Sequence, residues 1–155
     1  MNFKISDVTI SQKNDPLIIA EIGINHNGSL ERAIKIADQA IKSGAKVIKH
    51  QTHIVEDEYS YHAKNIKPGN SNKNIYKIIK DCSLNEEDEF KLMQYIKRKN
   101  KIFISTPFSL KAVDRLIKFK VPAFKVGSGE CNNHILLNYI AKQKKPIILS
   151  TGMND

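Results

Sequence analysis

Short apolar runs alternate along the chain with segments whose apolar residues recur at helical spacing. Residues 17–23 indicate a buried β-strand, because they are almost continuously apolar and rich in β-branched side chains. Residues 30–41 place their apolar side chains on one helical face, with Ser29 able to cap the helix start and Gly44 able to end it. Residues 46–52, which begin with the β-branched pair Val47 and Ile48 after Lys46, are the next predicted strand.

The same alternation continues through the second half of the sequence. Ser83-Leu84-Asn85-Glu86 has the form of a capping box, which predicts that a helix begins there. Beyond it the pattern predicts, in chain order, a strand at 101–106, a helix capped by Ser109, a strand at 123–128, a helix at 135–142 and a strand at 146–151. This order predicts an α/β protein with a parallel sheet.

Two segments fall outside the alternation. Within residues 1–16, the weak alternation from Phe3 to Ser11 predicts a small N-terminal hairpin. Residues 54–85 are too long for an ordinary connection in a compact domain. Apolar residues between Ile75 and Ile79 predict one short helix inside this long loop, which is either a lid over a binding site or a solvated insertion.

Two architectures fit five parallel strands. A doubly wound sheet of the flavodoxin type is complete at about this length. A (β/α)₈ TIM barrel needs about 250 residues, so the chain would supply only its first five strands, with the helices outside. Composition and periodicity alone favour the doubly wound sheet.

Every predicted strand carries polar side chains near its carboxyl end, although buried parallel strands should be almost wholly apolar. These side chains belong to Glu21, Lys49, Gln51, Thr106, Lys125, Ser128 and Ser150. Because the carboxyl ends of parallel strands share one edge of the sheet, the set predicts a binding site there. Lysines and hydroxyls suit a phosphate or carboxylate, and Glu21 could accept hydrogen bonds from substrate hydroxyls or move a proton.

Composition narrows the classes of partner. The 155 residues carry 25 Lys and Arg against 16 Asp and Glu, but the basic residues are spread along the chain, so we expect no nucleic-acid partner. No apolar run approaches the length of a membrane span, and the start lacks the core of a signal peptide. Cys82 and Cys131 make neither a disulfide framework nor a metal cluster, which predicts a cytoplasmic protein.

The five histidines do not form a metal site by their spacing. His50 has the opposite strand parity to Lys49 and Gln51, so we expect it to face the helices in a structural role. His26 and His53 lie where strands end or loops begin and could touch a ligand, but we expect them at the surface.

Five segments together resemble bacterial N-acetylneuraminate (sialic acid) synthases. They are Ala20 to Ser29, Lys49 to Glu58, Ser105 to Ser109, Lys125 to Asn133 and Ser150 to Asn154. The segments occur in the family's order and span essentially the whole chain. Legionaminic acid synthases are close relatives that share much of this pattern.

The resemblance implies a TIM barrel that condenses phosphoenolpyruvate with N-acetylmannosamine to give N-acetylneuraminate and phosphate. In the legionaminic acid branch, the sugar would be a 2,4-diacetamido-trideoxymannose. Carried over by motif, Glu21 would bind the amino sugar, and Glu130 would be catalytic, near the metal or its water. The residues implied to bind phosphoenolpyruvate are Lys49, Gln51, Thr106, Lys125, Ser128 and Ser150.

The family also implies a divalent metal, Mn²⁺ or Mg²⁺, held by histidines of later barrel strands. It further implies a homodimer whose site is completed by a C-terminal antifreeze-like domain. Neither part lies in these 155 residues, so we expect the first five strands of a barrel that is inactive alone. The alternative of another class is a non-catalytic doubly wound module that binds a phosphorylated ligand.

Overall fold

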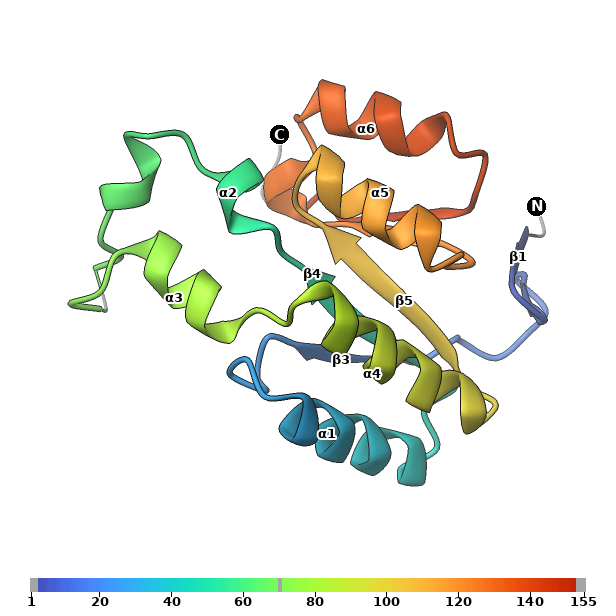
Figure 1. Ribbon diagram of the computed structural model, residues 1–155. Helices are drawn as coiled ribbons and strands as arrows, with labels where there is room; N and C mark the ends of the chain where they lie inside the picture. Colours follow the sequence, from blue (N-terminus) through green and yellow to red (C-terminus); the bar gives the residue numbers. More distant parts are fainter. Residues whose placement is uncertain (1–2, 70, 153–155) are drawn as a thin grey trace.

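The computed structural model describes residues 3–69 and 71–152 and contains two sheets (Figure 1). β1 (Phe3–Ile5) and β2 (Val8–Ile10) form an antiparallel pair, which confirms the predicted hairpin. The larger sheet is parallel and consists of β3 (Ile19–Gly23), β4 (Val47–Thr52), β5 (Ile102–Pro107), β6 (Phe124–Val126) and β7 (Ile147–Leu149). The predicted α/β class is therefore confirmed.

The order of the parallel strands separates the two candidate architectures. Within the described residues, each strand pairs with the next one along the chain, so the order is β3-β4-β5-β6-β7. A doubly wound sheet reverses its direction of growth at a switch point. Strands that are added continuously in one direction are the arrangement of a TIM barrel. The doubly wound alternative is therefore wrong.

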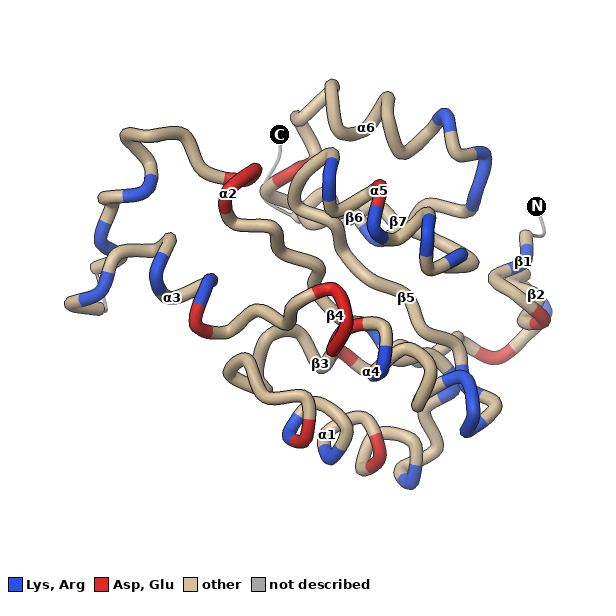
Figure 2. The backbone as a smooth tube through the Cα atoms, in the orientation of Figure 1, with Lys and Arg blue, Asp and Glu red and all other residues tan. Residues whose placement is uncertain are grey.

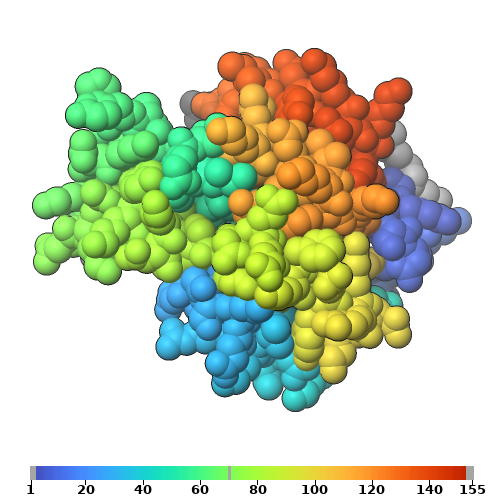
Figure 3. Space-filling view, viewed as in Figure 1, coloured from blue at the N-terminus to red at the C-terminus, as the bar shows by residue number. Residues whose placement is uncertain are grey.

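The long helices cover one face of this sheet. They are α1 (Leu30–Lys42), α4 (Glu86–Arg98), α5 (Leu110–Lys118) and α6 (His134–Ala141) (Figure 1). Between β4 and α4 the chain forms α2 (Val55–Glu58), the 3₁₀ helix η1 (Ala63–Asn65) and α3 (Ile75–Cys82), and η2 (Ser128–Glu130) follows β6. The segment with η1 and α3 projects from the body of the molecule (Figure 3), and α3 confirms the short helix predicted there.

Alternation along the strands divides the core into two parts. Side chains such as Ile48, Phe103 and Phe124 pack against the helices in the larger cluster. Their neighbours Val47, Ile104 and Ala123 form a second cluster on the opposite face, together with the fully buried Ile5 of the hairpin. The hairpin thus covers the amino-terminal part of this inner face. The inner face is apolar there, and its polar side chains begin further along the strands.

Helix α4 begins differently from the sequence prediction. Asn85 is its N-cap, and the Asn85 side chain accepts a hydrogen bond from the Asp88 backbone N–H at 2.8 Å. Ser83 instead ends α3, because its hydroxyl donates to the Ile79 carbonyl at 2.6 Å. The capping box from Ser83 to Glu86 is therefore wrong. The Ser83 hydroxyl is occupied by the preceding helix and cannot cap the following one.

Charged residues lie over most of the outer elements, and basic residues do not gather on one segment (Figure 2). Several lysines pair with an acidic residue one helical turn away, at N···O distances of 2.7–2.8 Å, namely Lys35 with Glu31, Lys42 with Asp38 and Lys91 with Glu87. This is the pattern of a solvated surface. Among the described helices, none has both the length and the apolar character needed to cross a membrane.

Gly28, in the loop between β3 and α1, has a backbone that only glycine adopts readily. Its φ is +73°, and an added Cβ would lie 2.6 Å from the Asp81 carbonyl oxygen. We expect Gly28→Ala to lower the free energy of unfolding by about 2 kcal/mol, measured by urea denaturation. Gly44→Ala is the control, since Gly44 has a φ of +95° but open space around it. Equal losses in both variants would contradict a role for the close contact with α3.

Candidate anion site at the carboxyl edge of the sheet

The structure brings the polar residues of neighbouring strands together on the inner face. Glu21 of β3 is the register partner of Lys49 of β4, and Gln51 of β4 is the partner of Thr106 of β5. Lys125 of β6 lies in the next strand. The predicted convergence at the carboxyl ends of these strands is thus present.

Glu21 and Lys49 are in direct contact as an ion pair. The Lys49 side chain is only 10% exposed, whereas the Glu21 side chain is 46% exposed. Glu21 also accepts a hydrogen bond from the Gly23 backbone N–H at 3.1 Å. The family resemblance assigned these two residues to different ligands, Glu21 to the amino sugar and Lys49 to phosphoenolpyruvate. The geometry shows instead that a ligand reaching Lys49 would share its ammonium group with Glu21.

The two lysines of the site are partly desolvated. Burial, followed by repulsion from Lys125, lowers the pKa of Lys49 to about 8. Because this pKa lies above 7, Lys49 keeps its charge at neutral pH and pairs with Glu21. Burial also lowers the pKa of Lys125. Two poorly hydrated cations that repel each other would be stabilised by an anion placed between them.

The Thr106 hydroxyl is the most unusual polar group of the site. Thr106 is 2% exposed, and its Oγ1 has no hydrogen-bond partner among the described residues. A buried hydroxyl without a partner costs about 1–3 kcal/mol. In the paired register Thr106 lies opposite Gln51, so its hydroxyl lies near the strand ends, where the other polar residues of the site converge.

The remaining predicted residues lie just beyond the strands. Ser150 follows β7, and its backbone N–H donates to the Val126 carbonyl at 3.1 Å. Ser128 begins η2, in the segment beside Lys125. Glu130 ends η2, and its carboxylate accepts a hydrogen bond from the Asn133 amide at 2.8 Å. Ser128 therefore lies in a 3₁₀ helix and Ser150 directly after β7, rather than in strands as predicted.

Glu130 lines a groove of about 340 Å³ at the rim of the site. The other residues of this groove come from α2, from the β5–α5 connection with the start of α5, and from the N-cap and first turn of α6. They are Asp57, Glu58, Phe108, Ser109, Leu110, Asn133, Ile135 and Leu136. Burial, then the charges of Glu58 and Glu130, raises the pKa of Tyr59. Glu130 therefore belongs to the acidic side of the rim.

His53 is buried, so its expected surface placement is wrong. Its Nδ1 lies 2.9 Å from Glu58 Oε2 and its Nε2 lies 3.2 Å from Gln51 Oε1. The ring also stacks on Phe108, with 4.3 Å between the ring centroids. The short helix α2 brings Glu58 back over the end of β4, which the sequence pattern did not reveal.

A second polar network lies on the opposite face of the sheet, between the strands and helices. His26 is fully buried, so its expected surface placement is also wrong, while the prediction that His50 faces the helices is confirmed. Glu89 of α4 is in contact with the Thr52 hydroxyl and lies 3.0 Å from Arg115 of α5. Sequence reasoning missed Glu89 and Arg115.

The hydrogen bonds of this network run in one direction. The Gly28 backbone N–H donates to His26 Nδ1 at 3.2 Å, so His26 must carry its proton on Nε2. His26 Nε2 then donates to His50 Nε2 at 3.1 Å, and His50 Nδ1 donates to Glu89 at 3.1 Å. Burial, then the neighbouring His50, lowers the pKa of His26 to about 4. The His26 ring is therefore neutral, as this series of hydrogen bonds requires.

Glu89 is the charged end of the network. Its burial opposes ionisation, but the hydrogen bonds and charges of its partners outweigh burial and lower the pKa of the carboxyl group. These partners are His50, Thr52 and Arg115. The network is therefore a structural ion pair that joins β4 to α4 and α5.

No three His, Cys, Asp or Glu side chains in residues 3–69 and 71–152 are grouped so that they could hold a metal ion. The resemblance places the ligands of its divalent metal in later barrel strands, outside these 155 residues.

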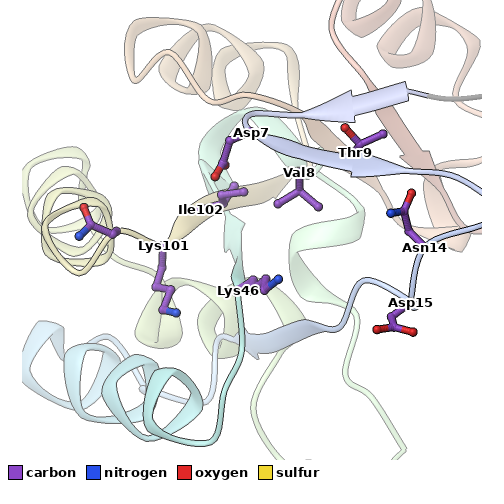
Figure 4. Close-up of a pocket in the computed structure, with 9 residues that line it drawn as sticks. Asp7, Val8, Thr9, Asn14, Asp15, Lys46, Lys101 and Ile102 are labelled. Carbon is purple, nitrogen blue, oxygen red and sulfur yellow. The ribbon is translucent and has the colours of Figure 1, made fainter.

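A cavity of about 500 Å³ lies at the other end of the sheet, beside the hairpin (Figure 4). Its lining includes Asp7, Asp15, Lys46 and Lys101. Lys46 directly precedes β4, so this cavity is separated from the strand-end site by the apolar part of the inner face. Its charged side chains are of both signs.

Comparison with known proteins gives one consistent result. The NeuB family matches residues 36–155. The chain is 40% identical over 152 residues to an uncharacterised protein of Methanocaldococcus jannaschii and 38% identical over 141 residues to N,N'-diacetyllegionaminic acid synthase of Campylobacter jejuni. These alignments cover 98% and 88% of this chain, which spans 42% of the length of each relative.

Among solved structures, the chain superposes on N-acetylneuraminic acid (sialic acid) synthetase of Leptospira borgpetersenii, crystallised with citrate, with a TM-score of 0.85. The sequence identity is 26%, and the match covers all of this chain and 51% of that one. The sheet with its outer helices thus corresponds to the N-terminal part of a TIM-barrel-like synthase. With five motifs at the strand ends and a family match over most of its length, the chain belongs to the NeuB family.

Proposed function

We propose that this chain contributes the phosphoenolpyruvate-binding half of a sugar acid synthase. The observation that carries the proposal is the unpartnered, buried Thr106 hydroxyl on the sheet edge that also carries two partly desolvated lysines. Lys49 and Lys125 would bind the phosphate and carboxylate, and Thr106 would donate its hydroxyl hydrogen to one of them. Gln51, Ser128 and Ser150 would complete this set of donors.

The reaction would join phosphoenolpyruvate to the open-chain aldehyde of an N-acetylmannosamine-type sugar. C3 of phosphoenolpyruvate forms a bond to the aldehyde carbon, water adds at C2, and the tetrahedral intermediate expels phosphate. Fixed cations at the strand ends would stabilise the negative charge as it moves onto the departing phosphate. Glu21 would accept hydrogen bonds from sugar hydroxyls, and Glu130 would act at the rim.

A second candidate differs in the sugar, a 2,4-diacetamido-trideoxymannose that would give a legionaminic acid. The 38% identity to a legionaminic acid synthase supports this candidate. Phosphate release from phosphoenolpyruvate in the presence of each sugar, measured with a version of the protein that contains the complete barrel, would discriminate between the two.

Calorimetric titration of the 155-residue chain tests the binding proposal directly. We expect phosphoenolpyruvate to bind more tightly than inorganic phosphate, which lacks the carboxylate, and than pyruvate, which lacks the phosphate. Sulfate serves as the control for general anion binding. If phosphoenolpyruvate binds no better than sulfate, the proposal is wrong.

Binding should also weaken at high pH. Lys49 holds its charge below a pKa of about 8 and loses it as the pH rises through that value. The anion's attraction to this residue is therefore fully present near pH 7 and declines toward pH 9.5, with the midpoint moved upward by the bound anion. Titrations at several pH values check this. Lys49→Arg should flatten the profile, because a guanidinium group stays charged throughout.

A further inference from the structure

We propose that Glu58 and His53 are positioning residues, which orient the Gln51 amide so that its NH₂ group faces the ligand. This inference rests on the proposed function for its ligand. Its geometric basis is a buried chain of contacts from Glu58 through His53 to Gln51. The side chains of His53 and Glu58 are 4% and 5% exposed.

Glu58 fixes one end of the chain. Its Oε1 accepts a hydrogen bond from the Ile54 backbone N–H at 2.6 Å, and its Oε2 lies 2.9 Å from His53 Nδ1. A carboxylate only accepts hydrogen bonds, so His53 must carry a proton on Nδ1. Stacking against Phe108 holds the plane of the ring, because the two rings are inclined by only 12°.

His53 then determines which end of the Gln51 amide points away from it. In the structure Nε2 faces Gln51 Oε1 at 3.2 Å, and an amide oxygen only accepts hydrogen bonds. The proposal therefore requires a His53 ring that carries a proton on both nitrogens and donates from Nε2 to Gln51. The Gln51 NH₂ group is consequently left on the other side, close to Gly23, where an added Cβ would lie 3.8 Å from Gln51 Nε2. Without this restraint the amide could rotate and present its oxygen, which repels an anion.

This arrangement explains why an acidic residue lies so near a site built for an anion. The Glu58 carboxylate accepts hydrogen bonds from the Ile54 backbone N–H and from His53. The group that faces the ligand is then the NH₂ of Gln51, a hydrogen-bond donor, and not the negative charge of Glu58. Comparable partners orient the ligand-binding side chains of other protein sites.

A double-mutant cycle on phosphoenolpyruvate binding tests the proposal. His53→Phe keeps an aromatic ring beside Phe108 but removes both ring nitrogens, and we expect it to raise the Kd about tenfold. In a Gln51→Ala background the same change should have little further effect, because no amide remains to be oriented. His62→Phe, at an exposed position, is the control. A tenfold loss from His53→Phe in both backgrounds would show a general structural role and overturn the proposal.

Nitrogen-15 NMR of the histidine rings gives a readout that needs no ligand. We expect both His53 nitrogens to carry protons in the unaltered chain. In Glu58→Gln, the new NH₂ group can donate to Nδ1, so the Nδ1 proton should be lost while the fold is kept. If Nδ1 is bare in the unaltered chain, the proposal fails whether or not phosphoenolpyruvate binds. If phosphoenolpyruvate does not bind but this NMR result holds, the proposed function fails and the orientation of Gln51 stands.

Discussion

Replacing Glu89 with glutamine is expected to lower the free energy of unfolding by about 3–5 kcal/mol, because it removes one partner of a buried ion pair. Glu89 is fully buried, and Arg115 Nη1 lies 3.0 Å from its Oε2. Glutamine has the same shape but places an NH₂ group where one of these oxygens was. That group would face either Arg115 or the pair formed by His50 and Thr52, leaving at least one donor opposed to another donor.

Urea denaturation followed by circular dichroism measures this loss. Glu87→Gln, on the same helix, is the matched control, because Glu87 is exposed and pairs only with Lys91 one turn away among the described residues. We expect no measurable change there, as for most exposed ion pairs. A loss below 1 kcal/mol for Glu89→Gln would mean that the network contributes little beyond packing.

Periodicity predicted the elements of the fold but not their arrangement. Helices α1 and α5 follow from apolar spacing and serine caps, since both signals are local. The strand order does not follow, because a doubly wound sheet and a barrel use the same βα repeat and differ only in which strands become neighbours. Which strands become neighbours depends on the direction in which each βα connection carries the chain along the sheet. No short-range sequence pattern encodes this direction.

The alternation of side chains along each strand predicted which face of the sheet carries the site. Residue type alone did not predict which of these side chains pair with each other. Lys49 and Gln51 share the inner face, and His50 lies on the outer one, as alternation requires. The direct pairing of Glu21 with Lys49 was missed, since it depends on the register between two strands. Glu89 was detectable, because an acid on the apolar stripe of residues 86–98, near Leu92 and Ile96, requires a buried partner.

Burial of His26 and His53 was mispredicted for one physical reason. Both lie in connections after strands, where exposure is the usual outcome. Here each connection folds back over the sheet, the first against α3 through Gly28 and the second through Glu58 of α2. The residues that bury His26 are distant in sequence, and those that bury His53 belong to a four-residue helix. Local hydrophobic patterns therefore reveal neither contact.

Lys49→Met is expected to weaken phosphoenolpyruvate binding about 100-fold without lowering the stability of the chain. The Lys49 ammonium is almost buried beside Lys125, so its removal relieves both desolvation and like-charge repulsion. Glu21 loses its partner but is 46% exposed and can be solvated by water. A residue that costs stability where it lies and is needed only for the ligand is typical of a binding site.

Lys46→Met provides the control for charge. Lys46 lies at the opposite end of the same strand, beside the hairpin cavity, and its loss changes the net charge by the same amount (Figure 4). We expect calorimetry to show an unchanged Kd for Lys46→Met, and thermal unfolding to show an equal or higher Tm for Lys49→Met. Similar losses of affinity in both variants would mean that the overall charge of +9, and not the strand-end lysine, attracts the anion. A large fall in Tm for Lys49→Met would instead make the ion pair with Glu21 a structural element, and Lys125 would then be the remaining cation of the proposed anion site.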